Sequence, residues 1–339
     1  MAIRRRHPKV AVTVLLCASI VLVRGALELD EDFSCAEIGC NSTHGITNYS
    51  YWRWSTTKSK QSSLSIGPAE NGRTGNAVTF DVIYCPPPNP NPDHLGCYRS
   101  ELALQRDVQD SLIPWTPYIG SNERWFGFSN RLVNFTFDGV DGIQLSGPIF
   151  QIHGGGGLPQ YKAKHPVVNL QVDATGCSAS NRSCPSYNIE VSNNIDPAAP
   201  RCAEQYPHCW SLGPALDPKT DSFGEWQDWV IRWKGSPSAT GGYLQVWRNG
   251  IEVLPTQHLA TAYNDTISPY MKFGVYRGVW KGTGRPTVSK RSTTAYGGIK
   301  VGDEHSSFDE VSTAQGKTSG TGATTTTSTT TGRPCTVDQ

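Results

Sequence analysis

Residues 242–253, GYLQVWRNGIEV, contain the clearest local structural pattern in the chain. Apolar and polar side chains alternate on both sides of the dipeptide Asn249-Gly250. Alternation with a period of two is typical of a half-buried β-strand. An Asn-Gly pair between two such runs favours a two-residue hairpin turn. This stretch therefore predicts two antiparallel strands joined by a tight turn.

Strand-like runs of the same kind recur along the chain, whereas helix signals are scarce. The runs are rich in β-branched and aromatic residues, and clusters of Gly, Pro and Asn separate them. Many short strands without intervening helices predict an all-β jelly-roll β-sandwich. The other expected strands are WFGFSNRLVNFTF (125–137), GPIFQIHG (147–154), VVNLQVDA (167–174), YNIEVS (187–192), WQDWVIRWKG (226–235), YMKFGVYRG (270–278) and GGIKVGD (297–303).

The two ends of the sequence differ in composition from its centre. Basic residues up to Lys9 precede an apolar run over 10–23, and small residues follow, which predicts a signal peptide over 1–25. The apolar run is shorter than the ~20 residues of a membrane span, so we expect a secreted, extracellular protein without membrane attachment. Residues 311–339 include a Thr/Ser/Gly-rich stretch and predict a disordered tail. The remaining residues, 26–310, are expected to form one β-jelly-roll domain.

Cysteine spacing agrees with an oxidising compartment. Beyond Cys17 in the predicted signal peptide, eight cysteines fall into four close pairs, and Cys335 is left over. Proximity favours sequential disulfides, and the spacing does not match the CxxC pattern of a zinc site. The pairs are Cys35 with Cys40, Cys85 with Cys97, Cys177 with Cys184, and Cys202 with Cys209; glycosylation sequons begin at Asn41, Asn48, Asn134, Asn181 and Asn264.

The formal net charge is +1 at pH 7, so no global field would attract nucleic acid. Any basic binding site must therefore be local. We expect no nucleic-acid partner and no membrane partner, and we expect a monomer.

Three strands combine a polar face with an apolar face. Alternate side chains of a strand point to the same side, so the polar residues of each strand point together. Taken singly, each pattern is more often structural: an Arg–Glu pair on a solvated face, a satisfied histidine, or Tyr and Lys on an outer sheet surface. If the strands are neighbours, their polar faces form one site. These residues are Arg99 and Glu101, then Gln151 and His153, then Tyr270, Lys272 and Tyr276.

The same three segments carry a family resemblance. RSEL (99–102), QIH (151–153) and YMKFGVY (270–276) resemble, in this order, the signature strands of alginate lyases of polysaccharide lyase family 7. A second resemblance spans roughly residues 97–303 and includes the Trp-rich segments at 226–235 and 241–250. It is to the secreted lyase superfamily of glucuronan lyase (family 20) and heparin lyase I. Both resemblances imply a jelly roll with a concave substrate cleft and a β-eliminating lyase of uronic-acid glycans such as glucuronan or alginate.

The implied chemistry assigns roles to the polar residues. Gln151 and Arg99 would neutralise the uronate carboxylate. Tyr276, made more acidic by a nearby cation, would remove H5 and protonate O4 where both lie on one side of the ring, as in glucuronate or mannuronate. Where they lie on opposite sides, His153 would be the base and Tyr276 the acid. The scheme requires no cofactor or metal; a structural calcium ion is compatible with it, but no ligand signature is present. Substrate contacts are assigned to Lys272, Tyr270, Glu101 and Arg277.

Two other functions fit the same fold, because fold does not fix function. One is a non-catalytic, lectin-like module that binds acidic glycans through Trp and Tyr. The other is a glycoside hydrolase, which needs two carboxylates flanking the scissile bond. Glu225 with Asp228, or Glu101, are candidate acids for it, but no compact signature is present.

Overall fold

The structure is a computed structural model, and it describes twelve segments of the chain. These are residues 27–31, 52–54, 62–83, 99–104, 123–134, 147–153, 166–173, 186–193, 205–212, 224–263, 269–277 and 291–314. The predicted signal peptide, the Thr-rich tail, every sequon except that at Asn134 and every cysteine except Cys209 lie outside the described residues. Cys209 is disulfide-bonded, so its partner also lies outside them and the predicted pairing stays a prediction.

The described strands form two antiparallel sheets, in agreement with the predicted all-β sandwich. Eight belong to one sheet: β1 (Leu27–Glu31), β3 (Ser62–Pro68), β4 (Asn76–Ile83), β6 (Glu123–Asn134), β11 (Trp226–Lys234), β12 (Tyr243–Arg248), β13 (Ile251–His258) and β15 (Arg291–Gly302). Their spatial order is β13-β12-β11-β6-β15-β4-β3, and β1 pairs with the end of β15. We call this the eight-stranded sheet.

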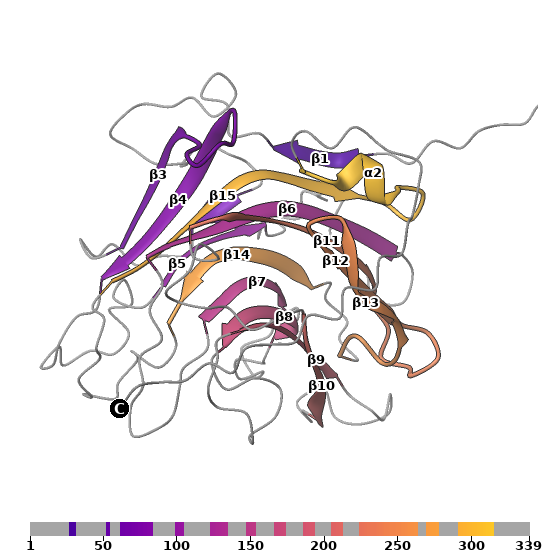
Figure 1. The fold of residues 1–339 in the computed structure, drawn as a ribbon. Coiled ribbons are helices and arrows are strands. Elements are labelled where there is room, and N and C mark those ends of the chain that lie inside the picture. Colours follow the sequence, from indigo (N-terminus) through magenta and orange to yellow (C-terminus); the bar gives the residue numbers. More distant parts are fainter. Residues whose placement is uncertain are drawn as a thin grey trace, which may run out of the picture.

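The other described strands form the seven-stranded sheet. Its members are β2 (Trp52–Trp54), β5 (Arg99–Leu104), β7 (Gly147–His153), β8 (Pro166–Asp173), β9 (Ser186–Asn193), β10 (Gln205–Ser211) and β14 (Tyr270–Tyr276). The spatial order is β10-β9-β8-β7-β14-β5-β2, so the three motif strands β7, β14 and β5 are direct neighbours. The long strands of both sheets appear as arcs that curve in the same sense (Figure 1).

The predicted hairpin is present between β12 and β13. Asn249 has φ 52° and Gly250 has φ 79°. Positive φ at both central residues is what a type I′ turn requires, and Asn and Gly adopt it at little cost. The Asn249 side chain also accepts a hydrogen bond from the Asp228 backbone N–H at 2.8 Å, which ties the turn to β11.

The core lies between the sheets and follows the period-two pattern. Trp229 and Trp233 of β11 are fully buried there, so both pack in the core. Tyr296 of β15 crosses from the eight-stranded sheet: its hydroxyl donates to Ile149 O at 2.5 Å and lies 3.1 Å from Gly274 O. The Gly274 N–H in turn donates to this hydroxyl at 3.2 Å. One side chain therefore links β15 to the backbones of β7 and β14.

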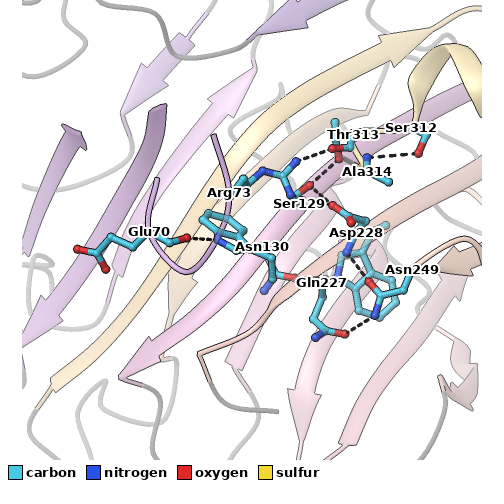
Figure 2. Close-up of polar contacts among 12 residues, drawn as sticks. Glu70, Arg73, Ser129, Asn130, Gln227, Asp228, Asn249, Ser312, Thr313 and Ala314 are labelled. Carbon is cyan, nitrogen blue, oxygen red and sulfur yellow. Dashed lines mark hydrogen bonds and ion pairs between the residues drawn. The ribbon is translucent and has the colours of Figure 1, made fainter. Parts of the chain in front are cut away.

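A short helix, α2 (Phe308–Val311), and the residues after it pack on the outer face of the eight-stranded sheet. Val311 is fully buried against Trp125 and Val230. Thr313 O accepts a hydrogen bond from Arg73 at 2.5 Å, and Arg73 also pairs with Asp228 (Figure 2). The packed chain therefore extends to residue 314, beyond the domain end predicted at 310, because Val311 supplies apolar surface that this face buries.

No helix within the described segments is long and apolar enough to cross a membrane.

Candidate active site

The seven-stranded sheet has a polar face on the side turned away from the core. Met271, Phe273 and Val275 of β14 point into the core, so their alternating neighbours point to this other side. The same rule applies to β5, β7, β8 and β9. The polar face carries Arg99, Glu101, Gln151, His153, Asn169, Gln171, Glu190, Tyr270, Lys272 and Tyr276.

Arg99 and Tyr276 form the first group on the polar face. The β5–β14 ladder places them directly opposite each other. The Arg99 guanidinium carbon lies 4.5 Å from the centroid of the Tyr276 ring. Tyr276 is half-buried, and its ring also contacts the core. Arg99 therefore places a cation directly beside the phenol ring.

Glu101 holds Arg99 in this position. Its carboxylate Oε2 lies 3.1 Å from Arg99 Nε, and its side chain is only 3 % exposed. Burial raises the pKa of Glu101, while the positive charges of Lys272 and Arg99 oppose that rise. A buried carboxylate that is ion-paired in this way acts on the guanidinium rather than directly on a polymer.

Gly274 allows the close approach of β14 to β5. It lies opposite Glu101 in the ladder and has φ 138°. A Cβ atom there would lie 2.3 Å from the carbonyl oxygen of Ser100, well inside van der Waals contact. Only glycine fits this position, so the spacing between Lys272 and Tyr276 on the polar face depends on it.

The second group is a block of four residues on β14 and β7. Lys272 is opposite Gln151, and Tyr270 is opposite His153. The His153 and Tyr270 rings stack with centroids 5.2 Å apart. The Lys272 ammonium lies 5.2 Å from the centroid of the Tyr270 ring. Lys272 makes no ion pair and Gln151 no side-chain hydrogen bond within the described part of the chain, so both are available to a ligand.

The register separates His153 from Tyr276. His153 pairs with Tyr270, and Tyr276 follows Tyr270 by six residues on β14, or ~20 Å along the strand. Lys272 is four residues from Tyr276, or ~13 Å, so Arg99 is the nearer cation to Tyr276. The structure therefore brings the predicted residues onto one face but divides them into two groups.

Three polar residues of this face did not stand out in the sequence. Gln171 Nε2 donates to Glu190 Oε1 at 2.6 Å, and Asn169 Nδ2 donates to Gln171 Oε1 at 2.9 Å and to Glu190 Oε2 at 3.4 Å. Asn169 lies directly opposite Gln151. The alternation of VVNLQVDA and YNIEVS would have placed these side chains on one face, but no motif pointed to β8 and β9.

One sequence-based assignment needs correction. Arg277 was expected to contact substrate, but it is fully buried just after the end of β14. The period-two rule explains this, because Arg277 follows Tyr276 and takes the opposite side. Of the carboxylates considered for hydrolysis, Asp228 pairs with Arg73 on the eight-stranded sheet, and Glu101 pairs with Arg99 on the seven-stranded sheet.

Within the described segments, no three His, Cys, Asp or Glu side chains are grouped as a metal site requires. The compatibility of the fold with a structural calcium ion stays a prediction.

Comparison with known proteins places the chain in a family. Residues 45–296 match the model of the polysaccharide lyase family, so the chain belongs to that family and is a polysaccharide lyase enzyme. No curated protein is similar enough in sequence to serve as a relative.

Solved structures support the fold. An endo-β-1,4-glucuronan lyase from the fungus Trichoderma reesei is 18 % identical with a TM-score of 0.57, over 78 % of this chain and 94 % of that one. A PL7 alginate lyase from Zobellia galactanivorans is 16 % identical with a TM-score of 0.43, over 79 % and 98 % of the two chains. An exolytic PL7 alginate lyase from the same organism is 9 % identical with a TM-score of 0.45, over 72 % and 88 %. Of these three, the glucuronan lyase is close enough to support the jelly-roll assignment.

Proposed function

We propose that this polysaccharide lyase is secreted and cleaves 4-linked uronic-acid glycans by β-elimination on the polar face of the seven-stranded sheet. The observation that carries the proposal is the Arg99–Tyr276 pair, with the guanidinium carbon 4.5 Å from the phenol ring, beside the Lys272–Gln151 pair. A cation next to a proton-transfer group, with a further cation and an amide on the same strand face, is what elimination beside a carboxylate needs.

The reaction requires one proton to leave C5 and one to reach O4. In this scheme the phenolate form of Tyr276 takes H5 from the uronate ring. The electron pair of the C5–H bond forms the C4–C5 double bond, and the C4–O4 bond breaks. Tyr276, now protonated, returns the proton to O4 of the departing chain. The products are an unsaturated uronate end and a new chain end with a free 4-hydroxyl.

Lys272 and Gln151 bind a carboxylate of the same polymer in this scheme. Lys272 supplies charge, and the Gln151 amide donates hydrogen bonds to an oxygen of this carboxylate, which belongs to a sugar residue other than the one that Tyr276 deprotonates, because ~13 Å of strand separates Lys272 from Tyr276. Both side chains are mostly buried and have no competing ion pair or hydrogen bond in the described part of the chain, so little must be broken before substrate binds.

The register favours substrates whose H5 and O4 lie on one side of the ring. An opposite-side elimination by His153 and Tyr276 would need both residues at one sugar, but ~20 Å of strand separates them. A single tyrosine suffices for glucuronate or mannuronate. Glucuronan-like polymers are therefore the first substrates to test, and the solved glucuronan lyase of the same fold supports that choice.

The test compares two tyrosines on one strand face. Purified wild-type protein, Tyr276→Phe and Tyr270→Phe are incubated with glucuronan and alginate, and the ultraviolet absorbance of the unsaturated ends is followed. We expect Tyr276→Phe to lose more than ~10²–10⁴ in rate, because it provides two proton transfers, while binding of intact polymer is retained. Tyr270→Phe should lose less.

Each alternative gives a different result. A wild-type protein that binds the polymer but leaves chain length unchanged would be a lectin-like module. Saturated products would indicate a hydrolase. If Tyr270→Phe were the more damaging change, the reaction centre would lie at the His153–Tyr270 pair rather than at Tyr276.

A further inference from the structure

Four side chains form one row across the polar face. Lys272, Gln151, Asn169 and Glu190 lie directly opposite one another on β14, β7, β8 and β9. Adjacent strands are ~4.8 Å apart, so the row is ~14 Å long between its end Cα atoms. It begins at a cation, passes two amides and ends at a carboxylate. A polymer lying along this row would therefore contact a positive charge at the Lys272 end of the row and a negative charge at the Glu190 end.

The carboxylate end of the row offers hydrogen-bond acceptors. The amide N–H groups of Gln171 and Asn169 are directed to Glu190, at 2.6 Å and 3.4 Å. Asn169 Oδ1 is a buried acceptor with no hydrogen-bond partner in the described segments, and Asn169 is only 9 % exposed. A carboxylate has no proton to donate to these oxygens, whereas a sugar hydroxyl has one. Glu190 itself is partly exposed, so a ligand can reach it.

We propose that Glu190, with Asn169 and Gln171, is a specificity-determining subsite that binds the hydroxyl groups of a sugar residue and disfavours a carboxylate there. The inference rests on the proposed lyase function of the same face. The Lys272 end selects the uronate carboxylate, and the Glu190 end selects a residue that presents hydroxyls. The preferred substrate class is then a uronate-containing glycan in which some residues lack a carboxylate, rather than a fully carboxylated polymer.

The experiment compares two polymers of equal length. One is fully carboxylated polyglucuronate, and the other is the same polymer with part of its carboxylates reduced to hydroxymethyl groups. The kcat/KM for unsaturated product is measured on both. Glu190→Gln keeps the volume of the side chain but removes its charge. We expect Glu190→Gln to raise the ratio of kcat/KM on the carboxylated polymer to kcat/KM on the reduced polymer by about threefold to tenfold. The reason is that the change removes a partly screened repulsion between Glu190 and a substrate carboxylate.

Glu225→Gln is the matched control. Glu225 is exposed beside β11 of the eight-stranded sheet, so the same change of charge there should leave the ratio unchanged. If Glu190→Gln melts like wild type and makes product with the wild-type ratio, the inference is wrong and the proposed function stands. If wild type forms no unsaturated product from either polymer, the proposed function is wrong and the inference falls with it.

Salt provides a second measurement that does not depend on one variant alone. Added salt shortens the range of electrostatic repulsion, from ~10 Å at 0.1 M to ~3 Å at 1 M. The rate advantage of Glu190→Gln over wild type on the carboxylated polymer should therefore shrink toward one at high salt. An advantage that is independent of salt would point to packing rather than charge, and would also overturn the inference.

Discussion

Gln151 and Gln227 are both buried glutamines in the interior of a sheet, with exposed fractions of 5 % and 3 %, but their surroundings differ. In the eight-stranded sheet, Gln227 Oε1 accepts hydrogen bonds from Arg248 at 2.8 Å and from Asn249 at 3.0 Å (Figure 2 shows the second). In the seven-stranded sheet, Gln151 makes no side-chain hydrogen bond within the described residues. The Gln227 amide therefore contributes hydrogen bonds to the fold, whereas we propose that the Gln151 amide binds substrate.

Lys272 of the polar face differs in the same way from the charged groups of the eight-stranded sheet. On the eight-stranded sheet, Arg73 pairs with Asp228 and Arg131 with Glu70, at 2.9 Å and 2.7 Å. On the polar face, Lys272 is mostly buried and makes no ion pair with any described residue. Leaving a buried polar group unpaired costs free energy, so an unpaired group is tolerated where a substrate completes it. The comparison therefore distinguishes Gln151 and Lys272, which we propose to bind substrate, from the paired groups that stabilise the eight-stranded sheet.

The largest expected effect comes from exchanging the two glutamines for alanine. Gln151→Ala should lower kcat/KM for product formation by ~10-fold to 100-fold, because the substrate loses a hydrogen bond from the amide to a charged group, with little change in melting temperature. Gln227→Ala should leave turnover per folded molecule unchanged and lower the free energy of unfolding by about 1–3 kcal/mol, because Arg248 and Asn249 lose their acceptor. Activity and urea unfolding are measured on both.

His153→Ala is expected to resemble Gln151→Ala. Suppose instead that either variant had a much lower free energy of unfolding and normal turnover per folded molecule. The mutated residue would then have a structural role like that of Gln227, and the proposed role of its strand in the active site would be wrong.

Removal of the chain after Glu310 tests the eight-stranded sheet alone. Such a truncation removes the buried Val311 and the contacts of Thr313, so the free energy of unfolding should fall by about 2–4 kcal/mol. Turnover by the folded fraction should persist, because the polar face belongs to the other sheet. A chain ending at Ala314 is the control and should match the full chain in stability, since the Thr-rich composition beyond it offers little apolar surface. Equal stability of the two truncations would show that residues 311–314 contribute nothing.

Tyr296→Phe tests the link between the sheets. The change removes the hydroxyl that serves Ile149 O and both backbone groups of Gly274, and it should lower the free energy of unfolding by about 1–3 kcal/mol. Activity per folded molecule should also fall modestly, because Gly274 lies between Lys272 and Tyr276. Urea unfolding and product formation are measured together. A loss of stability with full activity would mean that the hydroxyl stabilises the fold without setting the geometry of the polar face.

The sequence determined which residues form strands and which side chains share a face. Period two follows from the pleat of any strand. The sequence alone therefore predicts that Lys272 and Tyr276 share one face of their strand, and that Gln151 and His153 share one face of theirs. The Asn249-Gly250 turn was equally local, because it depends only on φ at two residues. The sequence left open whether the three polar strands are neighbours, and the order β7-β14-β5 shows that they are.

Only the tertiary structure decided the spatial order and the register of the strands. Register is set by contacts between segments far apart in sequence, and the periodicity within one strand does not specify it. It brings Arg99 to Tyr276 and His153 to Tyr270, and it adds Asn169 and Glu190 to the row that begins at Lys272. The burial of Val311 could not be predicted from the sequence for the same reason. Val311 packs against Trp125 and Val230, which belong to strands much earlier in the chain.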